Sequence, residues 1–439
     1  MKKLVSILLS MSVLLSLTAG CSRKTATSSH SHRPGSAEKT PDYETVPEIP
    51  YNGSATAVYN LEPAGAAGSN ATEEELREAY TRFIFGVMKR CASAAGTGDV
   101  LLSPDSILLA LDMTAAGASG ETLDQMLQTL MPGVGNAEGF QFAVERMNSL
   151  QNESLSIANS IWINKADADG IYSDYLDFVT RHFDAKVSIL PFNNDAVDRI
   201  NKWVEEKTNG MIPDLLKPTD LDATSVMALI NAITFEGDWK EAYSEEDISE
   251  GIFTNSEGIE REVTYLSSTE YTYLESESAT GFIKPYEGGK YGFMVILPSD
   301  ETVNINEYLA GMSEKEYWDL WNRRDNTEVD VRFPEFNSDY RVELPEVLKD
   351  MGMVAPFDGG TADFSLMTSG DVFIGKVIHQ THISVNREGT TAAASTAVVM
   401  DKNCAAGAGY YVNCDRPFVY AIVDLDTGLP VFLGTCTYQ

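Results

Sequence analysis

Residues 389–399 constrain the fold of this chain more than any other segment. All eleven are small or β-branched, and none is charged, a proline or a large aromatic. A surface loop is normally punctuated by Gly, Pro, Asn and Asp, whereas an extended strand alternates its side chains between two faces. One face of such a strand would carry Thr390, Ala392, Ala394, Thr396 and Val398. We therefore expect a loop that can also enter a crowded sheet as a strand.

The overall composition is that of a globular protein with an acidic surface. The 439 residues are 43% hydrophobic and 22% charged, which allows a substantial buried core. The formal net charge is −33 at pH 7. Such a negative field repels phosphate groups, so it argues against nucleic acid or an anionic lipid surface as the main partner.

The N-terminus has the pattern of an export signal. Two lysines precede an apolar run over residues 4–17, which is short for a membrane-spanning helix. Residues 18–21 resemble the lipobox of bacterial lipoproteins, in which the cysteine is acylated and becomes the new N-terminus. We therefore interpret residues 1–20 as a signal peptide and Cys21 as a lipidation site on the extracellular face of a bacterial membrane. The alternative is an ordinary cleaved signal and a secreted protein.

Residues 21–72 are predicted to be a flexible tether between that anchor and a folded domain. They are rich in Ser, Thr, Pro, Gly and Ala and show no sustained apolar periodicity. Thr72 with Glu75 then makes a capping-box pattern, which marks the start of a helix. Residues 73–439 show no internal repeat and no second linker, so we interpret them as one domain.

Apolar patterns inside this domain predict both helices and strands, an α+β fold. Residues 195–207 have helical spacing, with Ile200, Trp203 and Val204 on one face. Extended or alternating apolar runs predict strands at residues 226–235, 292–297, 329–333, 377–385, 418–423 and 430–433. The last two are expected to form a hairpin.

An ordered series of motifs in the domain resembles the serpins, a family of inhibitors of serine and cysteine proteases. The motifs are residues 102–107, 117–122, 158–162, 200–204, 231–239, 332–336, 348–353, 416–418 and 432–434. His379 also stands ten residues before Gly389, as the shutter histidine does in this family. Each motif is short, but their order spans nearly all of residues 73–439.

The resemblance implies a serpin fold, with three β-sheets surrounded by about eight to nine helices and an exposed reactive-centre loop at about 387–411. It implies a monomer that is not an enzyme but a covalent inhibitor, whose partner is a serine protease or, as a second class, a cysteine protease. The protease cleaves the loop and forms an acyl-enzyme ester, and the freed loop inserts into the main sheet and traps the enzyme. The energy comes from a native sheet that lacks one strand, a kinetic rather than an equilibrium stability. The open alternative is a non-inhibitory serpin that acts as a surface-anchored binding or adhesion module.

The resemblance also assigns residues around the loop. The hinge comprises Glu388, Gly389, Thr390, Thr391, Ala392, Ala393, Ala394, Ser395 and Thr396. The shutter and breach of the main sheet comprise Ser103, Ser106, Asn231, His379 and Trp239, and we expect His379 to be a hydrogen-bonded core residue near Asn231 and Ser106. Two residues before Gly389, inhibitory members usually carry Glu, whereas this chain has Arg387. Because Arg387 lies at the base of the loop, we expect it to tune inhibition without abolishing it.

The scissile bond is expected near residue 403. If Gly389 is the fifteenth residue before the bond, as the family spacing implies, the residue before the cut is Asn403. A shift of one residue gives Lys402, which suits a trypsin-like pocket, or Cys404 followed by Ala405, which suits an elastase-like or subtilisin-like enzyme. Both target classes stay open at this point.

The sequence contains five cysteines. Cys21 is assigned to lipid, and Cys91 is expected on the buried face of the first helix of the domain. Cys404 and Cys414 could form a disulfide in an exported protein. Cys436 could compete with either, and free thiols are the alternative.

The chain carries no pattern that indicates an enzyme, a metal site or a cofactor. His379 and His382 stand three apart on a predicted strand, so they face opposite sides and cannot hold one metal ion together. The Gly-x-Ser-x-Gly elbow, a phosphate-binding loop and paired-Cys zinc spacing are absent from the sequence. We therefore expect no catalytic residue, no metal and no cofactor.

Overall fold

The computed structural model describes residues 71–390 and 409–438, and the structural statements below refer to this part of the chain. It contains nine α-helices, which agrees with the expected eight to nine. They are α1 (Glu73–Ala95), α2 (Pro104–Ala115), α3 (Gly120–Leu130), α4 (Asn136–Leu150), α5 (Ser173–Phe183), α6 (Asn194–Lys207), α7 (Ile305–Gly311), α8 (Glu314–Asn322) and α9 (Pro345–Asp350).

Seventeen strands lie in the same residues. They are β1 (Val100–Leu102), β2 (Leu155–Asn164), β3 (Lys186–Leu190), β4 (Met227–Phe235), β5 (Gly237–Asp238), β6 (Ile248–Thr254), β7 (Glu260–Glu270), β8 (Tyr273–Glu275), β9 (Ala279–Pro285), β10 (Tyr291–Pro298), β11 (Val329–Pro334), β12 (Phe336–Glu343), β13 (Ile378–Val385), β14 (Gly389–Thr390), β15 (Tyr410–Asn413), β16 (Phe418–Asp424) and β17 (Pro430–Cys436).

The strands form four hydrogen-bonded groups, two of which are continuous with each other through β4 and β5, so that they make up the three sheets that the serpin resemblance predicts. The six-stranded sheet has the order β1-β17-β16-β10-β9-β8, and a four-stranded sheet has the order β15-β11-β7-β6. The third sheet, which we call the main sheet, is divided into two hydrogen-bonded groups, β3-β2-β4 and β12-β13-β14-β5. These groups belong to one sheet because β5 follows β4 after a single residue, Glu236.

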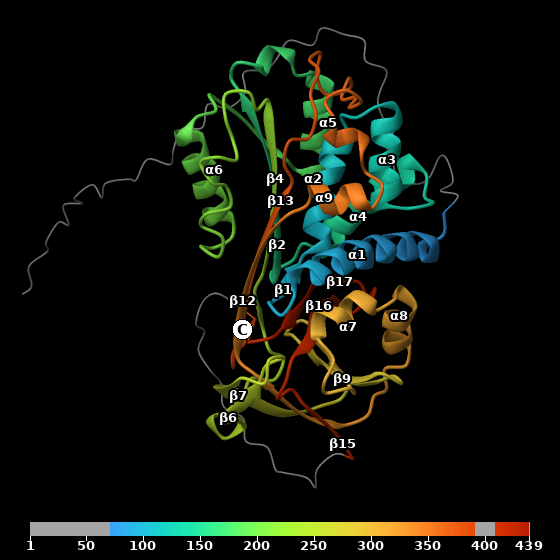
Figure 1. Cartoon of the computed structure of the whole chain (residues 1–439), viewed down its shortest axis with the longest axis vertical. Helices are drawn as coiled ribbons and strands as arrows, with labels where there is room; N and C mark the ends of the chain where they lie inside the picture. The colour runs from blue at the N-terminus through green and yellow to red at the C-terminus, as the bar shows by residue number, and fades with distance from the viewer. Residues whose placement is uncertain (1–70, 391–408, 439) are drawn as a thin grey trace, which may run out of the picture. The chain divides into compact units, whose positions relative to one another are not determined.

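The long strands of the main sheet lie between helices. Figure 1 shows β2, β4, β13 and β12 running alongside one another, with α6 on one side and α2 on the other. The ring of Trp203 on α6 meets the ring of Trp162 on β2 edge-on, with 6.2 Å between centroids. On the other face, α2 packs against β4. Movement of β4 therefore has to be accommodated by helices on both faces of the sheet.

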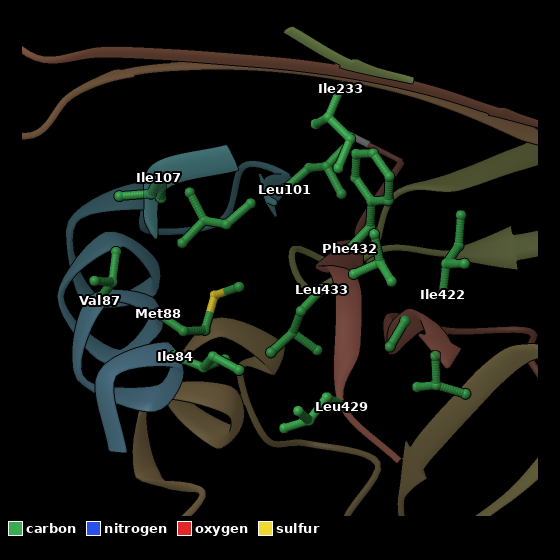
Figure 2. Close-up of a cluster of buried hydrophobic side chains, with 14 of the residues drawn as sticks. Ile84, Val87, Met88, Leu101, Ile107, Ile233, Ile422, Leu429, Phe432 and Leu433 are labelled. Atoms are coloured by element: carbon green, nitrogen blue, oxygen red, sulfur yellow. The ribbon is translucent and has the colours of Figure 1, made fainter. Parts of the chain in front are cut away.

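The main hydrophobic core lies between the helices and the six-stranded sheet. Ile84 and Met88 of α1 point toward Leu433 of β17 (Figure 2). Each of these side chains is at most 2% exposed. Full burial of such a side chain contributes about 1.5–3 kcal/mol, so this core anchors α1 firmly to the sheet.

Local sequence signals account for several element boundaries. Thr72 Oγ1 accepts a hydrogen bond from the Glu75 amide at 3.2 Å, and the Glu75 carboxylate accepts from the Thr72 amide at 2.8 Å. The predicted capping box is therefore confirmed, and α1 begins at Glu73. The predicted hairpin is β16–β17, and its turn contains Gly428 at φ +77°.

None of the described helices is both long and apolar enough to cross a membrane. The predicted signal peptide over residues 1–20, the lipidation site Cys21 and the tether up to residue 70 lie outside the described residues.

Candidate functional site

The base of the predicted loop already belongs to the main sheet. In β14, Thr390 pairs with Val385 of β13 on one side and with Gly237 of β5 on the other. Thr390 is 1% exposed, and its hydroxyl oxygen lies 2.5 Å from that of Tyr286. The first two residues of a new strand are therefore in place in the uncleaved chain.

Two glycines lie where β14 pairs with β5, and Gly389 allows the close approach of the two backbones. A Cβ atom on Gly389 would collide with the carbonyl oxygen of Gly237. A Cβ atom on Gly237 would lie 2.8 Å from the ring of Phe235, closer than real Cβ contacts allow. A side chain at Gly389 would push the two strands apart, because the atom it meets belongs to the backbone of β5, whereas one at Gly237 would displace the ring of Phe235.

Trp239, the predicted breach residue, links the base of the loop to the interior of the protein. Its ring stacks on Tyr286 with 4.6 Å between centroids and 12° between planes. Its Nε1 donates to the carbonyl oxygen of Asn386 at 2.8 Å, and its backbone amide donates to the carbonyl of Glu388 at 3.0 Å. One aromatic side chain thus joins the turn before β14 to the interior of the protein.

A buried ion pair lies beside Trp239. Lys284 Nζ lies 2.8 Å from Glu270 Oε1, and the two side chains are 2% and 6% exposed. The same ammonium lies 4.6 Å from the ring centroid of Tyr243 and 5.4 Å from that of Trp239. The carboxylate and the two rings together offset the cost of burying the lysine charge.

Arg387, which departs from the family pattern, has acidic neighbours. Its backbone amide donates to Glu335 Oε1 at 2.9 Å, and its Nε lies 3.4 Å from the same oxygen. Its Nη1 lies 3.4 Å from Glu245 Oε1. The arginine therefore ties the loop base to the junction between β11 and β12 and to the segment before β6, where the glutamate usual in the family would be repelled.

The turn that leads into β14 is closed by Asn386. Its Oδ1 accepts from the backbone amides of Glu388 at 2.8 Å and of Gly389 at 3.2 Å. An asparagine that bonds its own backbone in this way returns the chain sharply upon itself. The hinge therefore begins from a defined position next to β13.

Beyond β14, the two halves of the main sheet are separate. No ladder joins β4 to β13 in residues 71–390, and a cavity of about 540 Å³ lies between them. Residues 226–232 line one wall and residues 371–380 line the other. An unpaired strand edge presents backbone donors and acceptors, so this gap can accept one further strand.

His379, the predicted shutter histidine, bonds to the start of α2. It is 4% exposed, and its Nε2 accepts a hydrogen bond from the backbone amide of Ser103 at 3.0 Å. Ser103 Oγ in turn accepts from the amide of Ser106 at 3.4 Å and caps α2. Burial lowers the pKa of His379 to about 3, so the imidazole is neutral and able to accept.

Asn231, the other predicted shutter residue, lies across the cavity on β4. Its Nδ2 donates to Asn159 Oδ1 at 2.7 Å, while Asn231 Oδ1 is buried without a hydrogen-bond partner among the described residues. The structure brings Asn231, His379 and Ser106 to one cavity, as expected. The hydrogen bond of His379 nevertheless goes to Ser103, and none is found from it to Asn231 or Ser106 within the described ranges.

Four residues around this site were missed by sequence reasoning: Tyr286, Lys284, Asn159 and Glu335. Tyr286 and Lys284 stand in no motif and gain their roles from partners far away in the sequence. Asn159 and Glu335 are different because they lie in the motifs at residues 158–162 and 332–336. A search for an acidic partner of Arg387 within the recognised motifs could have found Glu335.

The remaining predicted site residues lie outside the described part of the chain. They are the hinge residues Thr391, Ala392, Ala393, Ala394, Ser395 and Thr396, and the bond-region residues Lys402, Asn403, Cys404 and Ala405. Cys91 is buried on α1, as predicted, and Cys414 and Cys436 are buried without a disulfide partner among the described residues. The disulfide between Cys404 and Cys414 stays a prediction.

The two histidines of β13 face opposite sides, as predicted. His379 is buried, whereas His382 Nδ1 lies 2.7 Å from Asp339 Oδ1 on the outer face. Within residues 71–390 and 409–438, no group of three or more His, Cys, Asp or Glu residues is arranged to hold a metal ion.

A family model described as serpin (serine protease inhibitor) matches residues 78–438. The chain belongs to the serpin family. Serpin B6 of Pongo abelii is 31% identical over 373 residues, which cover 82% of this chain and 98% of that protein. A leukocyte elastase inhibitor of Xenopus laevis is 29% identical, with 82% of this chain and 98% of the relative covered. The family model is described as a protease inhibitor and the relative is named as one, so the expectation that this chain is not an enzyme is confirmed.

Solved serpin structures match the fold over most of this serpin's length. The native state of a thermophilic serpin, tengpin, gives a TM-score of 0.76 at 34% identity and covers 85% of this chain and 96% of its own. The latent state of tengpin gives a TM-score of 0.73 at 33% identity, with 84% and 99% covered.

Proposed function

We propose that this serpin inhibits a serine protease as a suicide substrate, whose cleaved loop inserts between β4 and β13. The main support for this proposal is that β4 and β13 are separated by a gap and that β14 already occupies one end of it. A strand that extends β14 would satisfy the free backbone groups along both walls.

The residue pairing of β14 with β13 and β5 predicts which residues an inserted strand would face. If both ladders continue without a bulge, each inward residue of the hinge faces one residue of β13 and one of β4. The sets are Ala392 with Ile383 and Phe235, Ala394 with Thr381 and Ile233, and Thr396 with His379 and Asn231. Small side chains thus meet large buried ones, and a hydroxyl meets the two polar shutter residues.

This pairing explains the composition of the hinge. Ile383, Thr381, Phe235 and Ile233 are each at most 6% exposed, so little volume is left for a new side chain between them. Alanine at 392 and 394 fits that limit. Thr396 can supply the donor that Asn231 Oδ1 lacks among the described residues.

Insertion would also displace the attached protease. About fifteen residues at about 3.3 Å each carry the acyl-enzyme roughly 50 Å. Catalysis tolerates misplacement of only about 1 Å, so a protease distorted by the displacement cannot hydrolyse its ester. The target class remains open between a trypsin-like enzyme cutting after Lys402 and an elastase-like or subtilisin-like enzyme cutting near Cys404 and Ala405.

We also propose that Cys21 is acylated and holds the inhibitor on the extracellular face of a bacterial membrane. The lipobox-like residues 18–21 support this. A flexible chain the length of residues 21–72 has an average end-to-end distance of about 40 Å, which gives a large protease access to the loop. Detergent partitioning of the wild type and of Cys21→Ala should differ, and equal partitioning would favour secretion.

The mechanism is tested by incubation with trypsin, elastase and subtilisin, with active-site-blocked forms of each as controls. We expect one active protease to give an adduct that survives SDS, and a cleaved inhibitor whose melting temperature is far above that of the intact protein. N-terminal sequencing of the released fragment would then locate the bond. Cleavage without an adduct and without a rise in melting temperature would indicate a non-inhibitory serpin that acts as a binding or adhesion module.

A further inference from the structure

An ion-pair cluster lies across the far end of the gap. The segment at residues 208–226 leads from α6 to β4 and carries Asp220, whose side chain is 3% exposed. Asp220 Oδ1 lies 2.6 Å from Lys376 Nζ, and Asp220 Oδ2 lies 3.1 Å from Arg341 Nη2. Arg341 belongs to β12, and Lys376 stands two residues before β13. One carboxylate therefore connects the β4 side of the gap with the β12–β13 side.

Further hydrogen bonds hold the same cluster together. The backbone amide of Lys217 donates to Asp220 Oδ2 at 2.8 Å, and Lys376 Nζ lies 3.4 Å from the carbonyl oxygen of Thr219. Burial alone would raise the pKa of Asp220, but the bonds from Lys376 and the Lys217 amide outweigh it and lower that pKa. The carboxylate is therefore charged at neutral pH.

The ion-pair cluster lies at the wall of the cavity. Asp220 and Lys376 both line it, as do residues 226–232 and 371–380 of its walls. A strand that grows from β14 along β13 passes His379 before it reaches Lys376. Early insertion can therefore proceed with the cluster intact, whereas completion requires the walls to separate at Asp220.

We propose that Asp220, Arg341 and Lys376 form a latch that limits the rate at which loop insertion is completed. This inference rests on the proposed insertion mechanism and assigns a regulatory role to contacts outside the hinge, shutter and breach. Arg341 and Lys376 side chains are 22% and 39% exposed, so dissolved ions reach the cluster. The latch is consequently weakened by salt.

The latch is tested first without any protease. Asp220→Asn removes the negative charge of the ion pair at nearly constant side-chain shape. Lys376→Gln removes the positive charge of the same pair, at a more exposed position. Asp214→Asn, an exposed aspartate of the same segment, is the matched control. Hydrogen exchange of residues 212–226 should accelerate on the order of tenfold in the two latch variants but not in the control.

Salt provides a second readout. Between about 0.1 M and about 1 M salt the screening length falls from about 10 Å to about 3 Å. Exchange of residues 212–226 should rise over this range in the wild type and in Asp214→Asn, and stay nearly constant in Asp220→Asn. Equal salt responses in all three proteins would overturn the latch.

The third readout is insertion itself, followed by the rise in thermal stability after the loop is nicked. Asp220→Asn should complete this conversion several-fold faster than Asp214→Asn, and equal rates would refute the proposal even if exchange changed. The experiments distinguish a failure of the inhibition hypothesis from a failure of the latch hypothesis. Absence of a protease adduct in every variant counts against inhibition, while an unaltered exchange rate in Asp220→Asn counts against the latch alone.

Discussion

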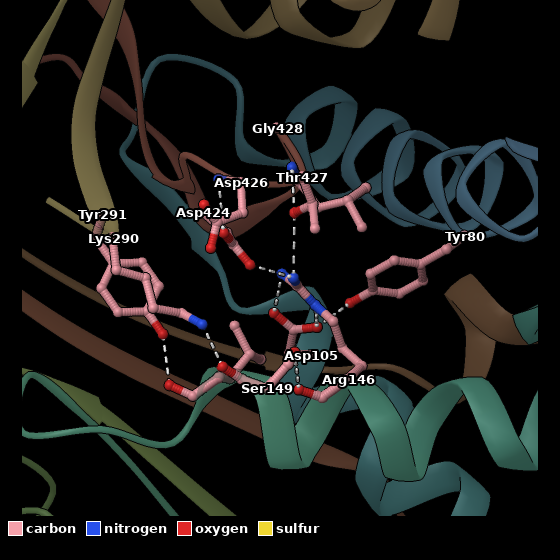
Figure 3. Close-up of polar contacts among 12 residues, drawn as sticks. Tyr80, Asp105, Arg146, Ser149, Lys290, Tyr291, Asp424, Asp426, Thr427 and Gly428 are labelled. Atoms are coloured by element: carbon pink, nitrogen blue, oxygen red, sulfur yellow. Dashed lines mark hydrogen bonds and ion pairs between the residues drawn. The ribbon is translucent and has the colours of Figure 1, made fainter. Parts of the chain in front are cut away.

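The cluster around Arg146 and the gap between β4 and β13 are both buried and polar, yet they differ in whether their polar groups have partners. Arg146 Nε and Nη1 lie 3.0 Å from carboxylate oxygens of Asp105 and Asp424, respectively (Figure 3). Tyr80 Oη donates to Asp105 at 2.7 Å. Two carboxylates, one guanidinium and one hydroxyl thus hold α1, α2, α4 and β16 together, and each carboxylate contacts the guanidinium.

The gap is the opposite case. Asn231 Oδ1 and Gln380 Oε1 are buried there without hydrogen-bond partners among the described residues. No ladder pairs the facing edges of β4 and β13 below β14 within residues 71–390. Each unmet buried group costs about 1–3 kcal/mol, and an inserted strand could recover that energy. The comparison shows that the Arg146 cluster has partners for its buried charges, whereas the gap leaves two buried side-chain oxygens that an inserted strand could satisfy.

Helix α2 contains one buried carboxylate that has partners and one that has none among the described residues. Asp105 and Asp112 both lie on α2 and are at most 1% exposed. Asp105 has Arg146 and Tyr80, whereas neither carboxylate oxygen of Asp112 has a hydrogen-bond partner in the described part of the chain. Burial of Asp112 therefore costs stability in the helix that forms part of the wall of the gap.

The largest effect is expected when the ion-pair cluster around Arg146 is disrupted. Arg146→Met leaves Asp105 and Asp424 buried without their cation, which should destabilise the protein by about 3–5 kcal/mol. The shift of the urea unfolding midpoint measures it. Lys202→Met, which removes an exposed pair with Glu206, is the control and should change stability by less than about 0.5 kcal/mol. Similar shifts for both variants would contradict the contrast between the regions.

The next effect is expected at the start of the gap. Thr390→Arg puts a charge against Tyr286 in the native protein and in any inserted strand, with a cost of about 2–4 kcal/mol. The variant should melt earlier than the wild type and should be cleaved without forming an SDS-stable adduct. Thr391→Arg, on the opposite face of an extended strand, is the matched control and should retain the adduct. An undiminished adduct yield in Thr390→Arg would refute loop insertion.

Replacement of Asp112 by the neutral Asn should stabilise the protein at pH 7. Burial raises the pKa of Asp112 well above its ordinary value, so the folded state binds this proton more tightly than the unfolded chain does. Stability from this group is therefore fully present below about pH 3.9 and is lost as pH rises toward the higher folded pKa. Asp112→Asn should gain about 1–2 kcal/mol at pH 7 and almost nothing near pH 3.5.

Melting curves at the two pH values measure this gain, with the exposed Asp124→Asn on α3 as the control. A gain of the same size at both pH values would show that ionisation of Asp112 is not its source.

The smallest expected effect concerns the loop base. Arg387→Glu would face Glu335 and Glu245, and Glu335→Arg would face Arg387. Because Arg387 is 39% exposed, each single change should cost only about 0.5–1 kcal/mol. The double variant exchanges the charges and should recover most of the loss. Melting temperatures of the four proteins form a double-mutant cycle, and strictly additive effects would mean that the pair is not coupled.

Much of the fold could be predicted from the chain because its signals are local or lie in ordered motifs. The capping box at Thr72, the helix at α6 and the strands β10, β11 and β13 follow from capping, spacing and alternation. The ordered motifs predicted the serpin fold, and the family match over residues 78–438 confirms it. Arg387 was also recognised as a departure, but its acidic partners were not.

The partners were missed because they depend on packing between distant segments. Glu335 is 52 residues before Arg387, and Tyr286 is 104 residues before Thr390. Periodicity indicates which residues are buried, but it does not indicate which buried residues touch. The same holds for Asp220 and Lys376, which are ordinary charged residues until the folded chain brings them 2.6 Å apart.

The amino-acid sequence by itself determined that residues 389–399 can form a strand, because side-chain size and alternation are properties of the segment alone. Only the tertiary structure decided where that strand begins and what it meets. It placed Gly389 and Thr390 between β5 and β13, left β4 and β13 apart beyond them, and tied the far end with Asp220. The physical reason is that an unfilled place in a sheet is a relation between strands far apart in the chain, and no single segment encodes it.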